Sequence, residues 1–390
     1  MNAAGPGQHP KPKRPALTDH ERLCRLRLIR SRRVGPVTWH RMLAEHGSAA
    51  AALLALPEIA RQAGVEGYQP CPEAVALHEM RAALAVGARM LVAGDAHYPA
   101  ALLGVADAPP VLWARGDLAM LARPMLAMVG ARNASSLGLR MARQLSAGLS
   151  EAGFVVVSGL ARGIDTEAHE HALSGGTVAV LAGGVDVIYP PENAALAARI
   201  AEAGVLLSEQ PPGVEAQARH FPLRNRIISG LSHALVVVEA AARSGSLITA
   251  QEAAEQGREV LAVPGHPLDP RAAGCNQLIR DGATLVRSVA DVIEAVGPAL
   301  AVHARPAPLQ AAKVRAAPDS LPPIAPRGAA GAGPADLGQQ ILDRLSPSPV
   351  AEDQLIRDLG LSAQVVMPEL LVLELAGDLL RHPGGMVSRA

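Results

Sequence analysis

The sequence predicts an α/β protein built on a Rossmann-like, doubly wound and mostly parallel sheet. Seven short apolar runs alternate with helix-like segments along the middle of the chain. Apolar strands separated by helices are typical of a parallel sheet that is covered on both faces. Small and polar residues follow most of these runs, and open sheets of this class bind ligands where their strands end. The strand candidates are 126–129, 154–157, 178–181, 205–207, 235–238, 260–263 and 284–286.

Length and composition limit the kinds of function that this chain can have. A chain of 390 residues is expected to form two or three domains. Its formal net charge is zero, so any site for a polyanion must be local. The only lysines are Lys11, Lys13 and Lys313, which lie in predicted tail or linker segments. A Schiff-base lysine or a phosphate-loop lysine in the main domain is therefore excluded.

The cysteines and the apolar segments predict a cytoplasmic protein. Cys24, Cys71 and Cys275 are far apart and show no ligand-like spacing, which favours reduced thiols. The first twenty residues have no apolar stretch typical of a signal peptide, and no long apolar run follows. We expect a soluble protein without a membrane partner.

Composition shifts divide the chain into five segments. We expect a disordered tail at 1–16, a helical domain at 17–72 and a Rossmann-like domain at 73–297. An Ala/Pro-rich linker at 298–335 and a winged-helix domain at 336–390 complete the chain.

The two small domains offer weaker functional signals. Helix, glycine turn and helix near Gly35 resemble a helix-hairpin-helix or sterile-alpha-motif unit, in which turn amides can hold a DNA phosphate. A small helical cap with a solvated basic face explains the same pattern. Near the C-terminus, helix–turn–helix followed by a hairpin predicts a winged helix. Its expected recognition helix, 362–375, carries Glu369 and Glu374 but no Arg or Lys, which favours a structural or protein-contact role.

Two predicted strand ends carry glycine, serine and arginine. Gly130 and Arg132 follow the first strand, where a close backbone approach, helix-start amides and a guanidinium favour a phosphate. Ser158, Gly159 and Arg162 follow the second strand and offer a hydroxyl, an accessible backbone and a further guanidinium.

The stretch from 220 to 250 combines the same residue types. An arginine-rich turn made of Arg224, Asn225 and Arg226 precedes a buried strand that ends at Glu239. A small-residue loop then opens the next helix, and one of the two arginines can instead pair with Glu239 and serve the fold. The loop residues are Ser244, Gly245 and Ser246.

No catalytic constellation stands out. Ser158, Asp165 and His169 suggest a hydrolytic triad, but no G-x-S-x-G elbow surrounds the serine, and Asp165 also suits a helix cap. The histidines show no metal spacing, and we expect neither a metal nor a cofactor. Between 126 and 296 there are thirteen arginines against seventeen acidic residues, so a DNA site must be a focused pocket. Aromatic residues are scarce, which argues against a base-stacking platform.

Five motifs occur in order along the middle of the chain. They are VGAR (129–132), SGLARGID (158–165), FPLRNRIISGL (221–231), SGSLITA (244–250) and NQLIRDGA (276–283). Together they resemble the DNA-processing protein A (DprA/Smf) family of bacteria, over roughly residues 95–296.

The resemblance implies a function without catalysis. It implies a single-stranded DNA-binding homodimer that protects incoming strands and loads the RecA recombinase onto them during natural transformation. A single-strand DNA-binding protein is a further candidate partner. Arg132 falls on the family's phosphate-binding Gly-Ser-Arg position, where Ala131 replaces the usual serine. Glu192 stands near the position of a DNA-contacting lysine in some members. The family's dimer edge maps to Leu278, Ile279 and Leu285.

Two other function classes remain open at this point. One is a nucleotide N-glycosidase, a related Rossmann enzyme that uses a glutamate within a P-G-G-x-G-T-x-x-E signature. The residues after Glu239 do not complete that signature. The other is a transcription regulator that acts through the winged helix.

Overall fold

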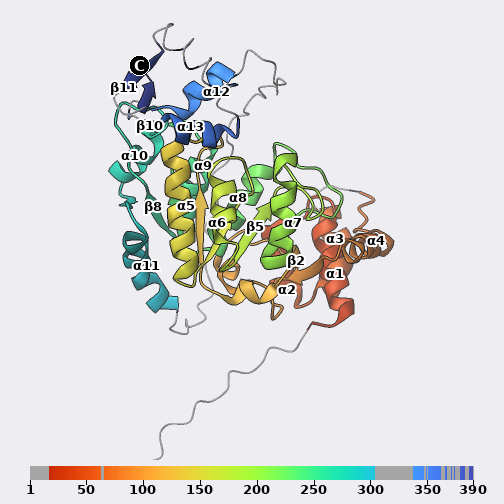
Figure 1. Ribbon diagram of the computed structural model, residues 1–390. Coiled ribbons are helices and arrows are strands. Elements are labelled where there is room, and N and C mark those ends of the chain that lie inside the picture. Colours follow the sequence, from red (N-terminus) through yellow and green to blue (C-terminus); the bar gives the residue numbers. More distant parts are fainter. Residues whose placement is uncertain are drawn as a thin grey trace, which may run out of the picture.

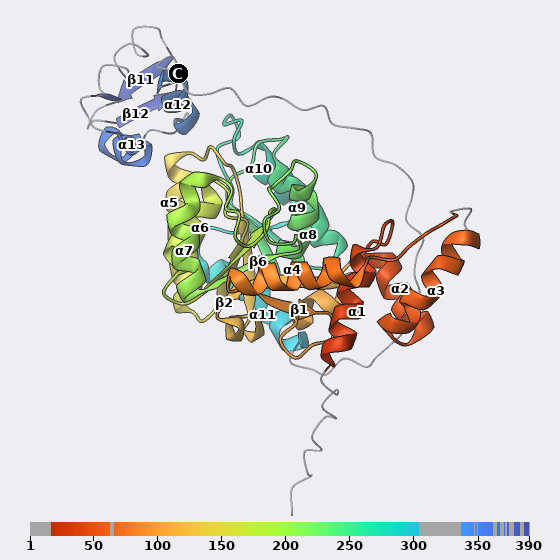
Figure 2. The same ribbon diagram turned by 90° about the vertical axis from the view of Figure 1, so that its right-hand side faces the viewer.

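The computed structural model describes residues 17–62, 66–303 and 337–389, the last range with gaps at 347, 349, 362–364, 367–369, 371–372, 374–377 and 383–385. A large α/β core carries a helical unit at one end and a winged-helix domain at the other (Figures 1 and 2). The predicted tail at 1–16 and the predicted linker beyond His303 lie outside the described residues.

The core is organised around a nine-stranded sheet in the order β1-β2-β6-β5-β4-β3-β7-β8-β9. All pairs from β6 to β9 are parallel, whereas β1–β2 and β2–β6 are antiparallel. The strand order reverses between β3 and β7, as in doubly wound folds. The strands are β1 (Arg89–Val92), β2 (Val111–Gly116), β3 (Met125–Val129), β4 (Val155–Ser158), β5 (Thr177–Leu181), β6 (Val205–Ser208), β7 (Ala234–Val237), β8 (Glu259–Ala262) and β9 (Thr284–Leu285).

Helices cover both faces of this sheet. On one face lie α5 (Ser136–Glu151), α6 (Ile164–Ala172), α7 (Ala194–Ala203) and α11 (Val289–His303); Figure 1 shows α5, α6 and α7 side by side in front of the strands. On the other face lie α8 (His220–Leu231), α9 (Gly245–Glu255) and α10 (Ala273–Arg280).

The alternation of side chains along β3 explains why this strand is central. Met125, Ala127 and Val129 pack into the apolar cluster that includes α8 and α9. Leu126 and Met128 pack into the cluster formed with α5, α6 and α11. Both faces are buried, so the strand is continuously apolar, as expected for an inner parallel strand.

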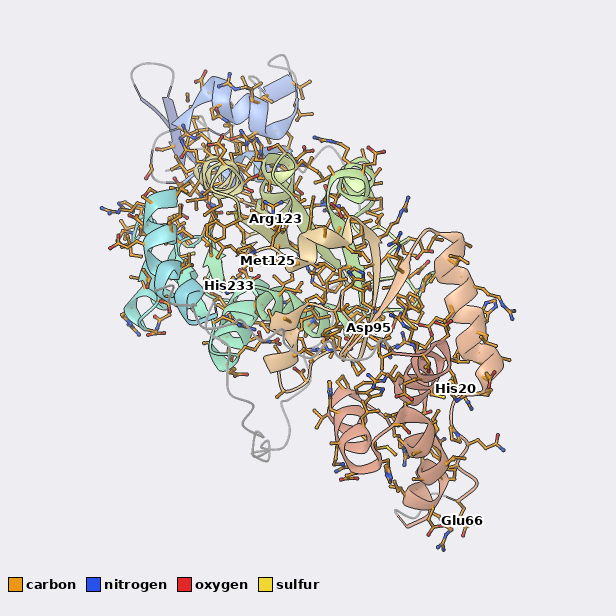
Figure 3. All side chains as sticks on the ribbon, turned by 90° about the horizontal axis from the view of Figure 1, so that it is seen from below. His20, Glu66, Asp95, Arg123, Met125 and His233 are labelled. Atoms are coloured by element: carbon orange, nitrogen blue, oxygen red, sulfur yellow. The ribbon has the colours of Figure 1, made fainter. Side chains whose placement is uncertain are left out.

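The N-terminal unit consists of α1 (Asp19–Arg30), α2 (Pro36–His46), α3 (Ala49–Gln62) and α4 (Glu73–Ala85). The arginines of α1 make contacts inside and outside this unit: Arg30 pairs with Glu79 of α4 (2.7 Å), and Arg22 pairs with Asp95 of the core (2.7 Å). Figure 3 labels His20 on α1 and Asp95 on the neighbouring core segment. The basic face predicted for α1 is therefore largely used in contacts within the chain.

The C-terminal unit has the predicted winged-helix order. It contains α12 (Leu337–Arg344), β10 (Val350–Ala351), α13 (Glu352–Leu359), β11 (Leu379–His382) and β12 (Met386–Arg389). The three strands form a sheet in the order β10-β12-β11. The expected recognition helix, 362–375, falls mostly outside the described residues.

All seven predicted strands of the parallel sheet are confirmed, with small shifts of their ends. The strand β2 was not predicted, although its run Val111-Leu112-Trp113-Ala114 is buried. Helix α11 continues to His303, past the predicted start of the linker. In the described part of the chain, no helix is long and apolar enough to cross a membrane.

Candidate functional site

A pocket of about 610 Å³ opens where the carboxyl ends of β3 and β7 meet. This is the point at which the strand order reverses, so the loops after the two strands diverge and leave a crevice. Figure 3 labels Arg123, Met125 and His233 at the opposite, amino-terminal ends of the same strands. The pocket is lined by the β3–α5 loop, the start of α8 and the β7–α9 loop.

The loop after β3 places Arg132 on the surface of the pocket. The amide of Ala131 donates to the carbonyl of Glu239 (2.7 Å), which joins this loop to the one after β7. Gly130 leaves room for that approach, because a Cβ there would lie 3.0 Å from the carbonyl oxygen of Glu239 and 2.6 Å from the side chain of Ile164. The guanidinium of Arg132 is exposed and lies 5.4 Å from the ring centre of Phe221. This cation–π contact holds the charge at the rim without neutralising it.

Arg224 and Arg226 lie in helix α8 rather than in the predicted turn. Two helical steps of about 100° place their side chains on opposite sides of the helix. Arg224 lines the pocket, and its Nη1 donates to the carbonyls of Gly159 (2.5 Å) and Val180 (2.6 Å). Burial lowers the pKa of Arg224 to about 10, with nearby Asp165 opposing the shift, so the guanidinium stays charged at neutral pH.

Arg226 faces away from the pocket. Its Nη2 pairs with Glu209 (2.7 Å), and its Nη1 donates to the carbonyl of Asp107 (2.5 Å). Only 4% of the residue is exposed. Arg226 therefore serves the fold. Its partner is Glu209, whereas the sequence suggested Glu239 as the partner of one of the two arginines. Asn225, between the two arginines, accepts from Nε of Arg224 (3.1 Å) and lines the pocket.

The end of β4 and the loop that follows it support the pocket. Ser158 is fully buried and its hydroxyl donates to the carbonyl of Met128 (2.6 Å), so it is not at the surface. A Cβ on Gly159 would lie 2.2 Å from Nη1 of Arg224, so this glycine makes room for the arginine. Arg162 is exposed, pairs with Glu192, and borders a smaller neighbouring cavity with Arg132 and Tyr189.

The suggested triad is a buried scaffold. Asp165 accepts from the amides of Gly159 (3.1 Å) and Ala161 (3.2 Å), which fixes the loop. Nε2 of His169 accepts from the amide of Leu160 (3.3 Å), a residue with φ of 56°. Ser158 has no histidine partner among its described contacts, so the three side chains do not form a nucleophile–base pair.

The tautomer of His169 follows from its partners. Thr177 uses its single hydroxyl hydrogen on the carbonyl of Val156 (2.7 Å), so it accepts from Nδ1 of His169 (2.7 Å). The imidazole therefore carries its proton on Nδ1 and is neutral. Burial lowers the pKa of His169 to about 3, and the charge of Arg224 adds to the effect.

The loop after β7 completes the pocket. Ser244 caps α9 by accepting from the amide of Ser246 (3.3 Å), and the two hydroxyls lie 2.6 Å apart. Gly245 is exposed, and no atom lies within 4 Å of where its Cβ would stand. Ser244, Gly245 and Ser246 all line the pocket.

Phe221, Arg243 and Arg271 are among the pocket residues that were not singled out from the sequence. Arg243 directly precedes the small-residue loop and is exposed, so its position after a predicted strand was a usable signal. Arg271 follows β8 at a distance along the chain and reaches the pocket only through the tertiary fold. Phe221 underlies both Arg132 and Arg224, with its ring centre 5.9 Å from the second guanidinium.

Glu239 lies beside the pocket rather than in it. Its carboxylate accepts from the amide of Ser135 (2.9 Å) and from the hydroxyl of the same residue, at the start of α5. Burial raises its pKa, and the bonds from Ser135 oppose this. The carboxylate is thus occupied as a helix-start anchor, which leaves little support for the N-glycosidase alternative.

The pocket is suited to holding phosphates. Four arginines and one aspartate line it, although the surrounding domain has more acidic than basic residues. Asp165, the one carboxylate, is engaged by backbone amides. In the described part of the chain, no three His, Cys, Asp or Glu side chains gather as a metal site. Guanidinium groups, hydroxyls and amides can bind an anion but offer no positioned acid–base pair.

Comparison with known proteins decides the family. The family model for DNA recombination-mediator protein A matches residues 89–297, which is more than half of the chain. The chain belongs to the DprA/Smf family. A DprA-like N-terminal HHH domain matches 19–82, and a DprA winged helix domain matches 325–385. The DprA/Smf assignment and the three-part architecture predicted from the sequence are confirmed.

Individual DprA/Smf relatives match over most of their length. DNA processing protein DprA of Bacillus subtilis is 46% identical over half of this chain and 67% of its own. Protein Smf of Escherichia coli is 40% identical over 76% of each chain. The X-ray structure of DprA from Streptococcus pneumoniae covers 72% of this chain and 98% of its own, with 36% identity and a TM-score of 0.59.

One solved DprA structure bears on DNA binding. It concerns the single-stranded DNA binding mode of DNA processing protein A from Helicobacter pylori. It covers 54% of this chain and 96% of its own, with 27% identity and a TM-score of 0.50.

Proposed function

We propose that this chain binds single-stranded DNA through its phosphates in the pocket between β3 and β7. The observation that carries the proposal is the set of pocket arginines, of which Arg132 and Arg243 are exposed at the rim. Arg224 supplies a buried, fixed positive charge behind them. The single-stranded DNA binding of the Helicobacter pylori relative supports the same assignment.

Single-stranded rather than duplex DNA fits the shape and composition of the pocket. The site is a focused crevice, not a broad basic face, so it suits a flexible strand whose phosphates can enter one at a time. Only one aromatic ring, Phe221, lines the pocket, and it stacks against arginines. Affinity then rests on phosphate contacts and depends on salt rather than on base sequence.

We further propose that the protein acts in the cytoplasm as a recombination mediator that protects incoming strands and loads RecA onto them during natural transformation. Membership of the recombination-mediator family supports this role. The absence of an acid–base pair among the described pocket residues favours holding the strand over processing it.

A homodimer through the β9 edge belongs to the same proposal. β9 ends the nine-stranded sheet, and Leu285 on it is 42% exposed. Leu278 and Ile279 on α10 are partly buried against the core and lie next to this edge along the chain. An unpaired strand edge with an exposed leucine suits pairing with a second copy.

A mobility assay tests the proposed function. The full chain is titrated against single-stranded and double-stranded oligonucleotides of the same sequence, with and without RecA and a single-strand DNA-binding protein. We expect retardation of the single strand at much lower protein concentration, and faster RecA filament formation when the protein is present. Equal affinity for duplex, or slower RecA loading, would contradict the proposal.

A further inference from the structure

The winged-helix domain places a carboxylate at one edge of the pocket. Asp343, near the end of α12, accepts at Oδ2 from Nδ2 of Asn133 (2.7 Å). Its main-chain carbonyl accepts from Nη1 of Arg271. Asn133 and Arg271 both line the pocket, and both also border a second cavity of about 500 Å³ between the core and the winged-helix domain.

The contact has the chemistry of anion recognition. A side-chain amide and a guanidinium each donate to an oxygen, as they would to two oxygens of a phosphodiester. Asn133 directly follows Arg132 in the loop after β3, so the two donors continue the phosphate-binding surface beyond the pocket centre. Nε of Arg271 also faces Asp269 (3.3 Å), which orients the guanidinium and leaves Nη1 for an outside oxygen.

The rest of the domain is complementary to this edge in charge. Residues 336–390 include eight acidic residues against four arginines. An ion pair joins Asp358 of α13 to Arg143 of α5 (3.5 Å), and the side chain of Asp358 is 1% exposed. Figures 1 and 2 show α13 lying against the start of α5. Oxygen atoms of one domain thus accept from side-chain N–H donors of the other at two places, and one of the two contacts is an ion pair.

We propose that Asn133 and Arg271 form a second phosphate subsite, and that Asp343 occupies it when no strand is bound. A strand that extends from the pocket onto this subsite must displace the end of α12. The winged-helix domain and single-stranded DNA therefore compete for the same donors. This inference rests on the proposed DNA-binding function and adds a subsite and a competitor to it.

Competition within one chain requires only weak contacts. Because the domain is tethered, its docking is intramolecular, and an effective concentration in the millimolar range lets a few hydrogen bonds and an ion pair hold it. A strand binds tightly only to the undocked fraction, so docking lowers the apparent affinity by that fraction.

The test compares Asp343→Ala with the wild-type full chain, using fluorescence anisotropy of a labelled oligothymidylate. We expect the variant to bind about three- to ten-fold more tightly, because the competitor is weakened. The matched control is Asp378→Ala, which removes an exposed acidic side chain elsewhere on the same domain. It should leave the affinity unchanged. No tightening in Asp343→Ala, or equal tightening in the control, would overturn the proposal.

A double-mutant cycle identifies the subsite itself. Arg271→Ala should weaken binding more in the Asp343→Ala background than in the wild type, where the guanidinium is already engaged. Equal losses in both backgrounds would contradict a shared subsite.

Scattering without DNA separates this inference from the proposed function. Small-angle X-ray scattering should show a more expanded particle for Asp343→Ala than for the wild type. Identical profiles would overturn the docking contact even if both proteins bind DNA. If neither protein binds the oligothymidylate, the proposed function fails, and the subsite fails with it, whereas the scattering still reports on the docking contact alone.

Discussion

The exposed rim of the pocket and the buried surroundings of helix α8 use arginine for different purposes. Arg132 and Arg243 are exposed, and their charges face solvent. Arg224 and Arg226 are buried, and their guanidinium groups donate hydrogen bonds to carbonyls and a carboxylate of the chain itself. Exposure and existing partners, rather than the presence of arginine in a motif, separate the groups that can bind a ligand from those that hold the fold.

The largest expected effect falls on the buried Arg226. Arg226→Ala leaves Glu209 buried without its partner, and the pKa of Glu209 is already raised by burial, which Arg226 opposes. Breaking such a pair should lower the free energy of unfolding by about 3 kcal/mol, measured by urea denaturation. Arg199→Ala, an exposed arginine paired with Glu170, should change little. Wild-type stability combined with lost single-strand binding would reverse our assignment of Arg226.

A smaller effect is expected at the glycine beneath Arg224. Gly159→Ala brings a Cβ to 2.2 Å from Nη1 of Arg224, so the guanidinium must move. We expect a loss of about 1–3 kcal/mol in unfolding free energy and a weaker affinity for single strands.

The matched control for that substitution is Gly245→Ala, since no atom lies within 4 Å of the Cβ position there. It should leave stability unchanged. Weaker DNA binding without a change in stability would then mark the backbone at Gly245 as a contact of the strand. If Gly159→Ala is as stable as Gly245→Ala, the close packing of Arg224 is not required.

The smallest expected effect depends on pH and concerns His169. Its pKa falls from 6.5 to about 3 on burial. Between these two pH values the imidazole is protonated in the unfolded chain but neutral in the folded chain. This contribution to stability is complete above pH 6.5 and is lost as the pH falls toward 3. Between pH 7.5 and 5.5 the wild type should lose about 1.4 kcal/mol relative to His169→Gln.

Urea denaturation of both proteins at the two pH values measures that difference. Glutamine keeps one donor and one acceptor but does not titrate, so the other ionisable groups cancel in the comparison. Parallel pH profiles of the two proteins would show that His169 is not buried neutral as described.

Much of the fold could be predicted because its signals are local. Most of the parallel strands are apolar runs, and all seven were found from the sequence. β2 was missed because it lies between antiparallel neighbours and leads into exposed Arg115 and Gly116, so it lacks the strand–helix alternation that marked the others.

The site could be predicted only in part. Which of its residues are exposed at the pocket and which are buried and paired depends on partners that are distant in the sequence. Gly130, Arg132, Gly245 and the serines beside it lie at the pocket as their positions after strands indicated. The burial of Ser158 and the pairing of Arg226 depend on Met128 and Glu209, which are distant in the sequence. Arg271 reaches the pocket from beyond β8, and no local pattern marks it.

The salt dependence of single-strand binding tests the central claim most directly. Arg132→Ala combined with Arg243→Ala removes both rim charges and should flatten the slope of log K against log salt by about 1.4, or roughly 0.7 for each phosphate contact. Arg199→Ala combined with Arg287→Ala removes two exposed arginines of the same domain that lie outside the pocket, and should leave the slope unchanged. Equal slopes for the rim variant and the wild type would contradict the account.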